Sequence, residues 1–142
     1  MTSARDAQPI RVGLATCAAL PNGDEDEWLL ATALNDRGLD TEWVVWSASE
    51  PAAMGERFDV VVIRSTWDYV DDREAFLAWV EACSVPVLNP TSIVRWNSNK
   101  AYMLDLLAAG VPTVPTHIVA TLDQDWSVPH GCEEIVVKPA VG

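Results

Sequence analysis

The most constraining feature of the sequence is the run Asp59–Arg64 (DVVVIR), in which four Val and Ile residues follow one another without alternation. A strand exposed on one face alternates apolar and polar residues, whereas a parallel strand covered on both faces has a continuous apolar run. The run therefore predicts a parallel strand with helices on both sides of its sheet. Ile10–Cys17, Trp43–Trp46 and Val85–Leu88 predict three further strands.

Helix signals separate the predicted strands. We expect a helix that begins at Asp24, with the acidic residues 24–27 at its positive end, apolar residues from Trp28 onward, and Gly38 past its other end. Asp71 and Asp72 open a second helix, whose predicted apolar side consists of Phe76, Leu77, Trp79 and Val80. Regular alternation of strands and helices predicts an α/β fold with a Rossmann-like open parallel sheet and right-handed crossovers.

The pattern changes after residue 94. Lys100–Ala109 is a predicted helix that glycine and prolines terminate, and His117–Val119 and Ile135–Pro139 are two predicted strands that pair as a hairpin. A chain of 142 residues accommodates one domain and a smaller unit. We therefore predict a boundary between residues 1–94 and residues 95–142.

Composition excludes several classes of partner. The formal net charge of -12 would repel phosphate backbones and anionic membrane surfaces, so we expect no nucleic acid and no membrane partner. An anionic nucleotide is still compatible, because a pocket needs only one or two well-placed cations. The three cysteines are widely separated and form no CxxC pair, which is typical of reduced thiols. Without a signal peptide or a membrane-length apolar run, we expect a cytoplasmic protein.

The loops after the strands carry the candidate substrate-binding residues, since ligands of open parallel sheets bind beyond the carboxyl ends of the strands. After the third predicted strand, Arg64 and Asp68 suit a substrate carboxylate and a substrate amine, and Ser65 and Thr66 offer hydrogen bonds. The alternative is an internal ion pair between Arg64 and Asp68 that only shapes the loop.

Two asparagines are further candidates for substrate binding. Asn89 follows the fourth predicted strand and Asn97 precedes the predicted helix of the second unit, with turn and cap roles as the alternative. His117 and His130 have no acid or nucleophile at a catalytic spacing. The acidic segment Asp24–Glu27 is better explained as a helix start than as a metal site. We therefore expect no catalytic residue and no metal ligand in this sequence.

An ordered set of motifs spans nearly the whole chain. It consists of Arg-Ser-Thr-Trp-Asp-Tyr at 64–69, Asn-Pro at 89–90, Arg-Trp-Asn at 95–97, Lys100, Gly-Val-Pro at 110–112, Pro-Thr at 115–116 and Val-Val-Lys-Pro at 136–139. Their order resembles the ATP-grasp superfamily, and within it the glutathione-synthetase-like group that contains the cycloserine-forming cyclo-ligases. Val-Val-Lys-Pro alone is common, so the order carries the resemblance.

The resemblance implies that residues 1–94 form the substrate domain that precedes an ATP-grasp domain, and that residues 95–142 are the truncated start of that nucleotide-binding domain. It also implies that Lys100 and Lys138 bind ATP phosphates, to which each ammonium group offers a compact charge and three donors. A solvated helix residue and an edge-strand charge are the respective alternatives for the two lysines.

The implied function is the N-terminal part of an ATP-dependent carboxylate-amine ligase, which forms an acylphosphate and then an amide. In the family the Mg²⁺ ligands lie downstream of Val-Val-Lys-Pro, so we expect ATP and Mg²⁺ as cofactors, and no ligase activity from these 142 residues alone. The expected partners are ATP and a small carboxylate or amine substrate. Whether the protein forms a homo-oligomer stays open.

A noncatalytic α/β ligand-binding or regulatory domain is the alternative. A phosphate-accepting receiver domain needs an acid at the end of the third strand, where this sequence has Arg64. A dinucleotide-binding oxidoreductase needs a glycine-rich turn after the first strand, where this sequence has Cys17–Pro21. A subunit that completes its site with a partner chain is a third interpretation.

Overall fold

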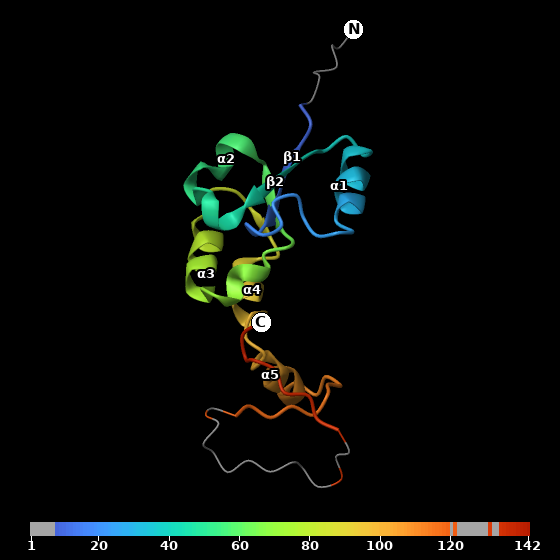
Figure 1. Cartoon of the computed structure of the whole chain (residues 1–142), viewed down its shortest axis with the longest axis vertical. Coiled ribbons are helices and arrows are strands. Elements are labelled where there is room, and N and C mark those ends of the chain that lie inside the picture. The colour runs from blue at the N-terminus through green and yellow to red at the C-terminus, as the bar shows by residue number, and fades with distance from the viewer. Residues whose placement is uncertain (1–7, 120, 122–130, 132–133) are drawn as a thin grey trace. The chain divides into compact units, whose positions relative to one another are not determined.

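The computed structural model of the chain describes residues 8–119, 121, 131 and 134–142. It divides into two compact units, Met1–Val94 and Arg95–Gly142. Figure 1 shows the helices and strands along the chain. Every helix among the described residues is too short or too polar to cross a membrane. The assignment of substrate binding to the first unit and of nucleotide binding to the second stays a prediction.

The first unit is built on a four-stranded sheet whose strands all run parallel, in the order β2-β1-β3-β4. The strands are β1 (Arg11–Thr16), β2 (Asp40–Val45), β3 (Val60–Ile63) and β4 (Val87–Leu88). In the register, Val12 of β1 lies opposite Thr41 on one side and opposite Val60 on the other. The sheet confirms the predicted Rossmann-like open parallel arrangement, and each of the four strands predicted in this unit overlaps an observed one.

Helices lie on both sides of this sheet, as a continuous apolar strand requires. In Figure 1, α1 lies to one side of the strands, and α2 and α3 lie to the other. The elements are α1 (Trp28–Asn35), α2 (Met54–Arg57), α3 (Arg73–Ala82), α4 (Thr91–Asn97) and the short 3-10 helices η1 (Trp46–Ala48), η2 (Pro51–Ala53) and η3 (Trp67–Val70). Asp72 caps α3 by accepting a hydrogen bond from the Ala75 N–H at 3.0 Å, as its position before the helix predicts.

The main core of the first unit lies between α3 and the sheet. All four residues of the predicted apolar side of α3 are buried: Phe76, Leu77, Trp79 and Val80. The Phe76 ring meets the Trp46 ring edge-on, with 5.2 Å between centroids. On β1, glycine at position 13 leaves room for Phe58, because a Cβ added to Gly13 would lie 3.0 Å from that ring. Aromatic packing therefore fixes α3 and the segment before β3 on the same face of the sheet.

Helix α1 differs from the prediction. It begins at Trp28 rather than at Asp24, and its residues Trp28 and Leu29 are 60% and 54% exposed, so they do not form a buried apolar side. Residues 24–27 precede the helix, and Glu27, the last of them, is 7% exposed. The prediction failed because the Glu27 side chain points into the unit and is held there by polar partners. The segment is anchored by these contacts rather than by apolar burial.

The second unit contains one longer helix among its described residues, α5 (Tyr102–Ala108), which lies inside the predicted helix Lys100–Ala109. Just before the helix, Asn99 Oδ1 accepts a hydrogen bond from the Ala101 N–H at 2.9 Å and forms a local turn. Trp96 lies against this helix, because its Nε1–H donates to Asp105 Oδ2 at 2.7 Å. Side-chain hydrogen bonds thus hold the turn before α5 and the flank of the helix.

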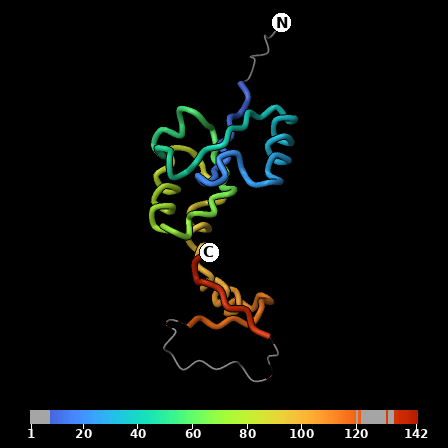
Figure 2. The backbone as a smooth tube through the Cα atoms, viewed as in Figure 1, coloured from blue at the N-terminus to red at the C-terminus, as the bar shows by residue number. Residues whose placement is uncertain are grey.

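The two strands predicted in the second unit are wrong. Neither His117–Val119 nor Ile135–Pro139 forms a strand. A strand needs a neighbour that accepts and donates backbone hydrogen bonds along its length, and these segments have none among the described residues. The backbone pairing found in the described part of this unit is a single antiparallel bridge between Asn99 and Val141. Figure 2 shows the C-terminal residues, in red, running beside the helix that follows this bridge.

Cys83, which ends α3, makes the stability of the first unit depend on pH. Burial raises the pKa of this thiol from 9.0 to about 11. The folded state therefore favours the neutral thiol, and the resulting stabilisation is complete below pH 9 and is lost as the pH rises toward 11. We expect the urea midpoint to fall less between pH 8 and pH 10 in Cys83→Ala than in the unsubstituted chain. Equal losses in both proteins would contradict this assignment.

Candidate functional site

The switch point of the sheet lies between β1 and β3, because the chain passes to one side of β1 to form β2 and to the other to form β3. Ligands of open α/β sheets bind outside the strand ends at such a point. The loop after β1 supplies Asp24 and Glu27, and the loop after β3 supplies Arg64 and Ser65. These four residues are called the switch-point cluster. The Cys17 N–H donates to the Ser65 carbonyl at 3.1 Å and ties the two loops together.

Glu27 is the buried acid of the switch-point cluster, and its two carboxylate oxygens have different partners. Oε1 lies 3.1 Å from Nε of Arg64 in an ion pair. Oε2 accepts a hydrogen bond from the Ser65 hydroxyl and a second one, at 3.3 Å, from the Asp24 N–H. Ser65 is fully buried. A carboxylate at this depth needs such partners to offset the loss of water.

Arg64 is the exposed member of the pair, with a side chain 38% exposed against 8% for Glu27. The alternative ion pair between Arg64 and Asp68 is wrong. Asp68 Oδ1 instead accepts a hydrogen bond from Nε1 of Trp46 at 2.5 Å. Thr66 is 4% exposed and lies immediately before η3. The structure thus brings Arg64 and Ser65 together through Glu27, while Asp68 bonds to the core and Thr66 is buried.

The two candidate asparagines lie in different units. Asn89 follows β4 in the first unit, and Asn97 is the last residue of α4 in the second. Both are exposed. Neither belongs to the switch-point cluster, so substrate binding by Asn89 or Asn97 stays a prediction.

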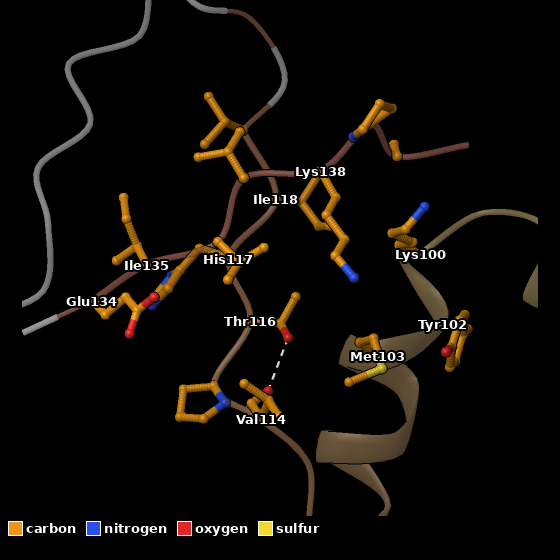
Figure 3. Close-up of a pocket in the computed structure, with 16 residues that line it drawn as sticks. Lys100, Tyr102, Met103, Val114, Thr116, His117, Ile118, Glu134, Ile135 and Lys138 are labelled. Atoms are coloured by element: carbon orange, nitrogen blue, oxygen red, sulfur yellow. Dashed lines mark hydrogen bonds between the residues drawn. The ribbon is translucent and has the colours of Figure 1, made fainter. Parts of the chain in front are cut away.

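The two candidate lysines line one cavity of the second unit, which has a volume of about 1050 Å³. In Figure 3 the Lys138 side chain extends into the space between Thr116 and Lys100. Apolar residues form much of the remaining wall, including Met103 and Ile118. Among the described residues neither lysine forms an ion pair.

Backbone contacts explain why the two lysines share this cavity. The Lys100 N–H donates to the Ala140 carbonyl at 2.7 Å. The neighbouring bridge joins Asn99 to Val141. Because Lys138 is only two residues before Ala140, this pairing brings its side chain to the start of α5. The two lysines are therefore brought to one cavity by backbone hydrogen bonds, and not by contacts of their own side chains.

The described residues do not fit a magnesium site at this cavity. Glu134 is the carboxylate that lines it, and no group of three or more His, Cys, Asp or Glu side chains among the described residues is placed to hold a metal ion. Mg²⁺ takes six oxygen ligands and is commonly held by one or two carboxylates together with substrate phosphates. The described part of the chain provides no such set of its own.

Comparison with known proteins decides the family. A family model described as the N-terminal domain of the D-cycloserine synthetase DcsG matches residues 12–89, which is more than half of the chain. The chain belongs to the DcsG N-terminal domain family. The matched range covers the sheet from Val12 of β1 to the end of β4, and the whole switch-point cluster. The predicted resemblance to cycloserine-forming proteins is thereby confirmed.

Two DcsG relatives agree with this assignment. The cycloserine biosynthesis protein DcsG of Streptomyces lavendulae is 42% identical over 99 residues, which are 68% of this chain and 32% of that protein. The crystal structure of the D-cycloserine synthetase DcsG matches with a TM-score of 0.64 and 32% identity, over 74% of this chain and 35% of the other. The chain thus spans about a third of the length of these relatives. The structural match confirms the predicted α/β fold.

Sequence reasoning missed Glu27 as a site residue. An acid before a helix is a common helix start, and the residues that Glu27 binds are far away in the sequence. The order of the strands in the sheet would have identified Glu27 as a site residue. Glu27 follows the first strand and Arg64 follows the third, and the carboxyl ends of those two strands meet at the switch point.

Proposed function

We propose that this chain is the N-terminal part of an ATP-dependent carboxylate-amine ligase. In this proposal the second unit contributes Lys100 and Lys138 to the binding of ATP phosphates, and the first unit contributes Arg64 to the binding of a substrate carboxylate. Membership of the DcsG N-terminal domain family supports the ligase class. The chain spans about a third of its DcsG relatives, so the activity of the whole protein is part of the proposal.

The observation that carries the proposal is that the chain contains only two lysines and both line the same cavity. Here neither lysine pairs with an acid among the described residues. Two ammonium groups that have no acidic partner in the described part of the chain, beside a partly apolar wall, suit a nucleotide, which has a charged phosphate chain and an apolar base.

The proposed reaction has two steps. A carboxylate oxygen of the substrate attacks the γ-phosphorus of ATP, and ADP leaves as the acylphosphate forms. An amine nitrogen then attacks the acyl carbon, and phosphate leaves as the amide forms. The lysines would offset negative charge on the phosphates in the first step, where electrostatic stabilisation dominates phosphoryl transfer. Arg64 would hold the carboxylate through its planar guanidinium fork.

Competitive amine labelling tests the nucleotide site directly. The 142-residue chain is treated with limiting acetic anhydride, with and without millimolar ATP, and acetylation of each lysine is measured by mass spectrometry. We expect ATP to slow acetylation of both Lys100 and Lys138, because bound phosphates cover their amino groups. AMP, which lacks the β- and γ-phosphates, should protect them less.

The N-terminal amine of the same chain is the internal control for reagent consumption by the nucleotide. Repeating the labelling in denaturing urea should remove the protection of both lysines. Equal acetylation rates with and without ATP in the folded chain would reject the proposed nucleotide site.

A further inference from the structure

The switch-point cluster contains a buried acid that is fixed more firmly than the arginine it binds. Glu27 has three partners: the Ser65 hydroxyl, the Asp24 N–H and Nε of Arg64. Ser65 is itself fully buried, and its carbonyl is held by the Cys17 N–H. Glu27 is therefore a rigid support, because it is anchored to the loops after both β1 and β3. The more exposed Arg64 contacts this support most closely through Nε.

The closest contact between Glu27 and the Arg64 guanidinium lies at one end of the group. Nε lies 3.1 Å from Glu27 Oε1. Within the described part of the chain, the two terminal nitrogens of Arg64 form no hydrogen bond. In a planar guanidinium these two nitrogens form a fork that matches the two oxygens of a carboxylate. The side chain is 38% exposed, so this fork is open to a ligand.

We propose that Glu27 is a positioning residue that holds Arg64 ready to bind the carboxylate of a small substrate. This inference rests on the proposed function. It adds that Glu27 holds the Arg64 side chain in place for carboxylate binding. An unsupported arginine samples many rotamers and loses that freedom when it binds a ligand. Holding the guanidinium in advance removes part of this cost, which corresponds to about a tenfold gain in affinity.

The sign of the effect separates positioning from simple electrostatics. The charge of Glu27 repels an approaching carboxylate. If Glu27 were only a bystander, removing its charge would raise the positive potential at Arg64 and strengthen anion binding. A positioning role predicts the opposite, because Arg64 would then have to be ordered by the ligand. A loss of affinity on removing a negative charge is therefore diagnostic.

The test is a carboxylate titration of the 142-residue chain, followed by NMR chemical-shift changes at constant ionic strength. D-serine is the probe, and D-serinamide, which lacks the carboxylate, is its matched ligand control. We expect D-serine to bind more tightly than D-serinamide and Arg64→Lys to weaken D-serine binding at least about tenfold, since lysine cannot form the bidentate contact. Glu27→Ala should weaken it about tenfold.

Two further variants control for folding and for charge. Glu27→Gln keeps the size of the side chain and an oxygen that accepts from Ser65, and it should bind D-serine about three- to tenfold more weakly than the unsubstituted chain. Glu25→Ala removes a neighbouring exposed acid of the same loop and should leave D-serine binding unchanged or slightly tighter. Each variant is first compared with the unsubstituted chain by circular dichroism.

Two results would overturn the inference. One is equal binding of D-serine and D-serinamide to the unsubstituted chain, because the site would then have no preference for a carboxylate. The other is tighter D-serine binding by a folded Glu27→Gln or Glu27→Ala variant. The titration contains no nucleotide, so its outcome is independent of the lysine-labelling result that tests the proposed ATP site.

Discussion

Phe76→Ala is expected to lower the free energy of unfolding of the first unit by about 3–5 kcal/mol. Phe76 is 2% exposed and contacts the rings of Trp46, Tyr69 and Trp79, with centroid separations of 5.2 Å, 5.5 Å and 6.5 Å. Truncation removes the apolar burial and leaves a cavity that three rigid rings cannot fill. Because small domains are stable by only about 5–15 kcal/mol, the loss is a large fraction of the total.

Urea unfolding followed by near-ultraviolet circular dichroism measures this effect, since the tryptophan rings around Phe76 report on packing. Trp28→Ala is the matched control, because it also deletes a large aromatic side chain but from a position that is 60% exposed. We expect the control to change the unfolding free energy by less than about 1 kcal/mol. Similar losses in the two variants would show that the core does not lie between α3 and the sheet.

Lys138→Ala is expected to weaken ATP binding by about 10- to 100-fold. The value follows from the loss of one charge-assisted contact, which corresponds to about 1.5–3 kcal/mol. The double variant Lys100→Ala with Lys138→Ala leaves the cavity without a lysine, and it should show no measurable binding. Equilibrium dialysis with labelled ATP gives the dissociation constants.

Arg37→Gln is the matched charge control for the lysine variants. It also removes one positive charge, but Arg37 is an exposed residue of the first unit whose guanidinium bonds to the Ala33 carbonyl at 2.8 Å. Its ATP affinity should stay within about twofold of the unsubstituted chain, since exposed charges are strongly screened by salt. An equal loss of affinity in Arg37→Gln and Lys138→Ala would mean that net charge, and not the cavity, governs binding.

The sheet of the first unit could be predicted because the residues of each strand form a recognisable local sequence pattern. The unbroken run that forms β3 and the Asp72 cap before α3 each specify an element without reference to distant residues. The predicted strands of the second unit failed for the opposite reason. Ile135–Pro139 has a strand-like composition, but a strand forms only when a neighbour satisfies its backbone groups. Local composition does not show whether such a neighbour is present.

The candidate site was predictable in part. The order of motifs pointed to Lys100 and Lys138, and the structure places both at one cavity. The position of Arg64 after a strand pointed to a ligand-binding loop, but its partner was not evident from the sequence. Glu27 and Arg64 meet because β1 and β3 are neighbours in the sheet, which is a property of the topology rather than of either loop.

The central place of β1 in the sheet has a consequence for synthesis of the protein on the ribosome. This strand emerges first, yet both of its neighbours are made later, and its contact with β3 joins residues as distant as Val12 and Val60. The apolar residues of β1 therefore stay uncovered while dozens of further residues are translated. Pairings between distant segments form slowly and leave such surfaces open to aggregation, so a nascent chain of this kind benefits from chaperones.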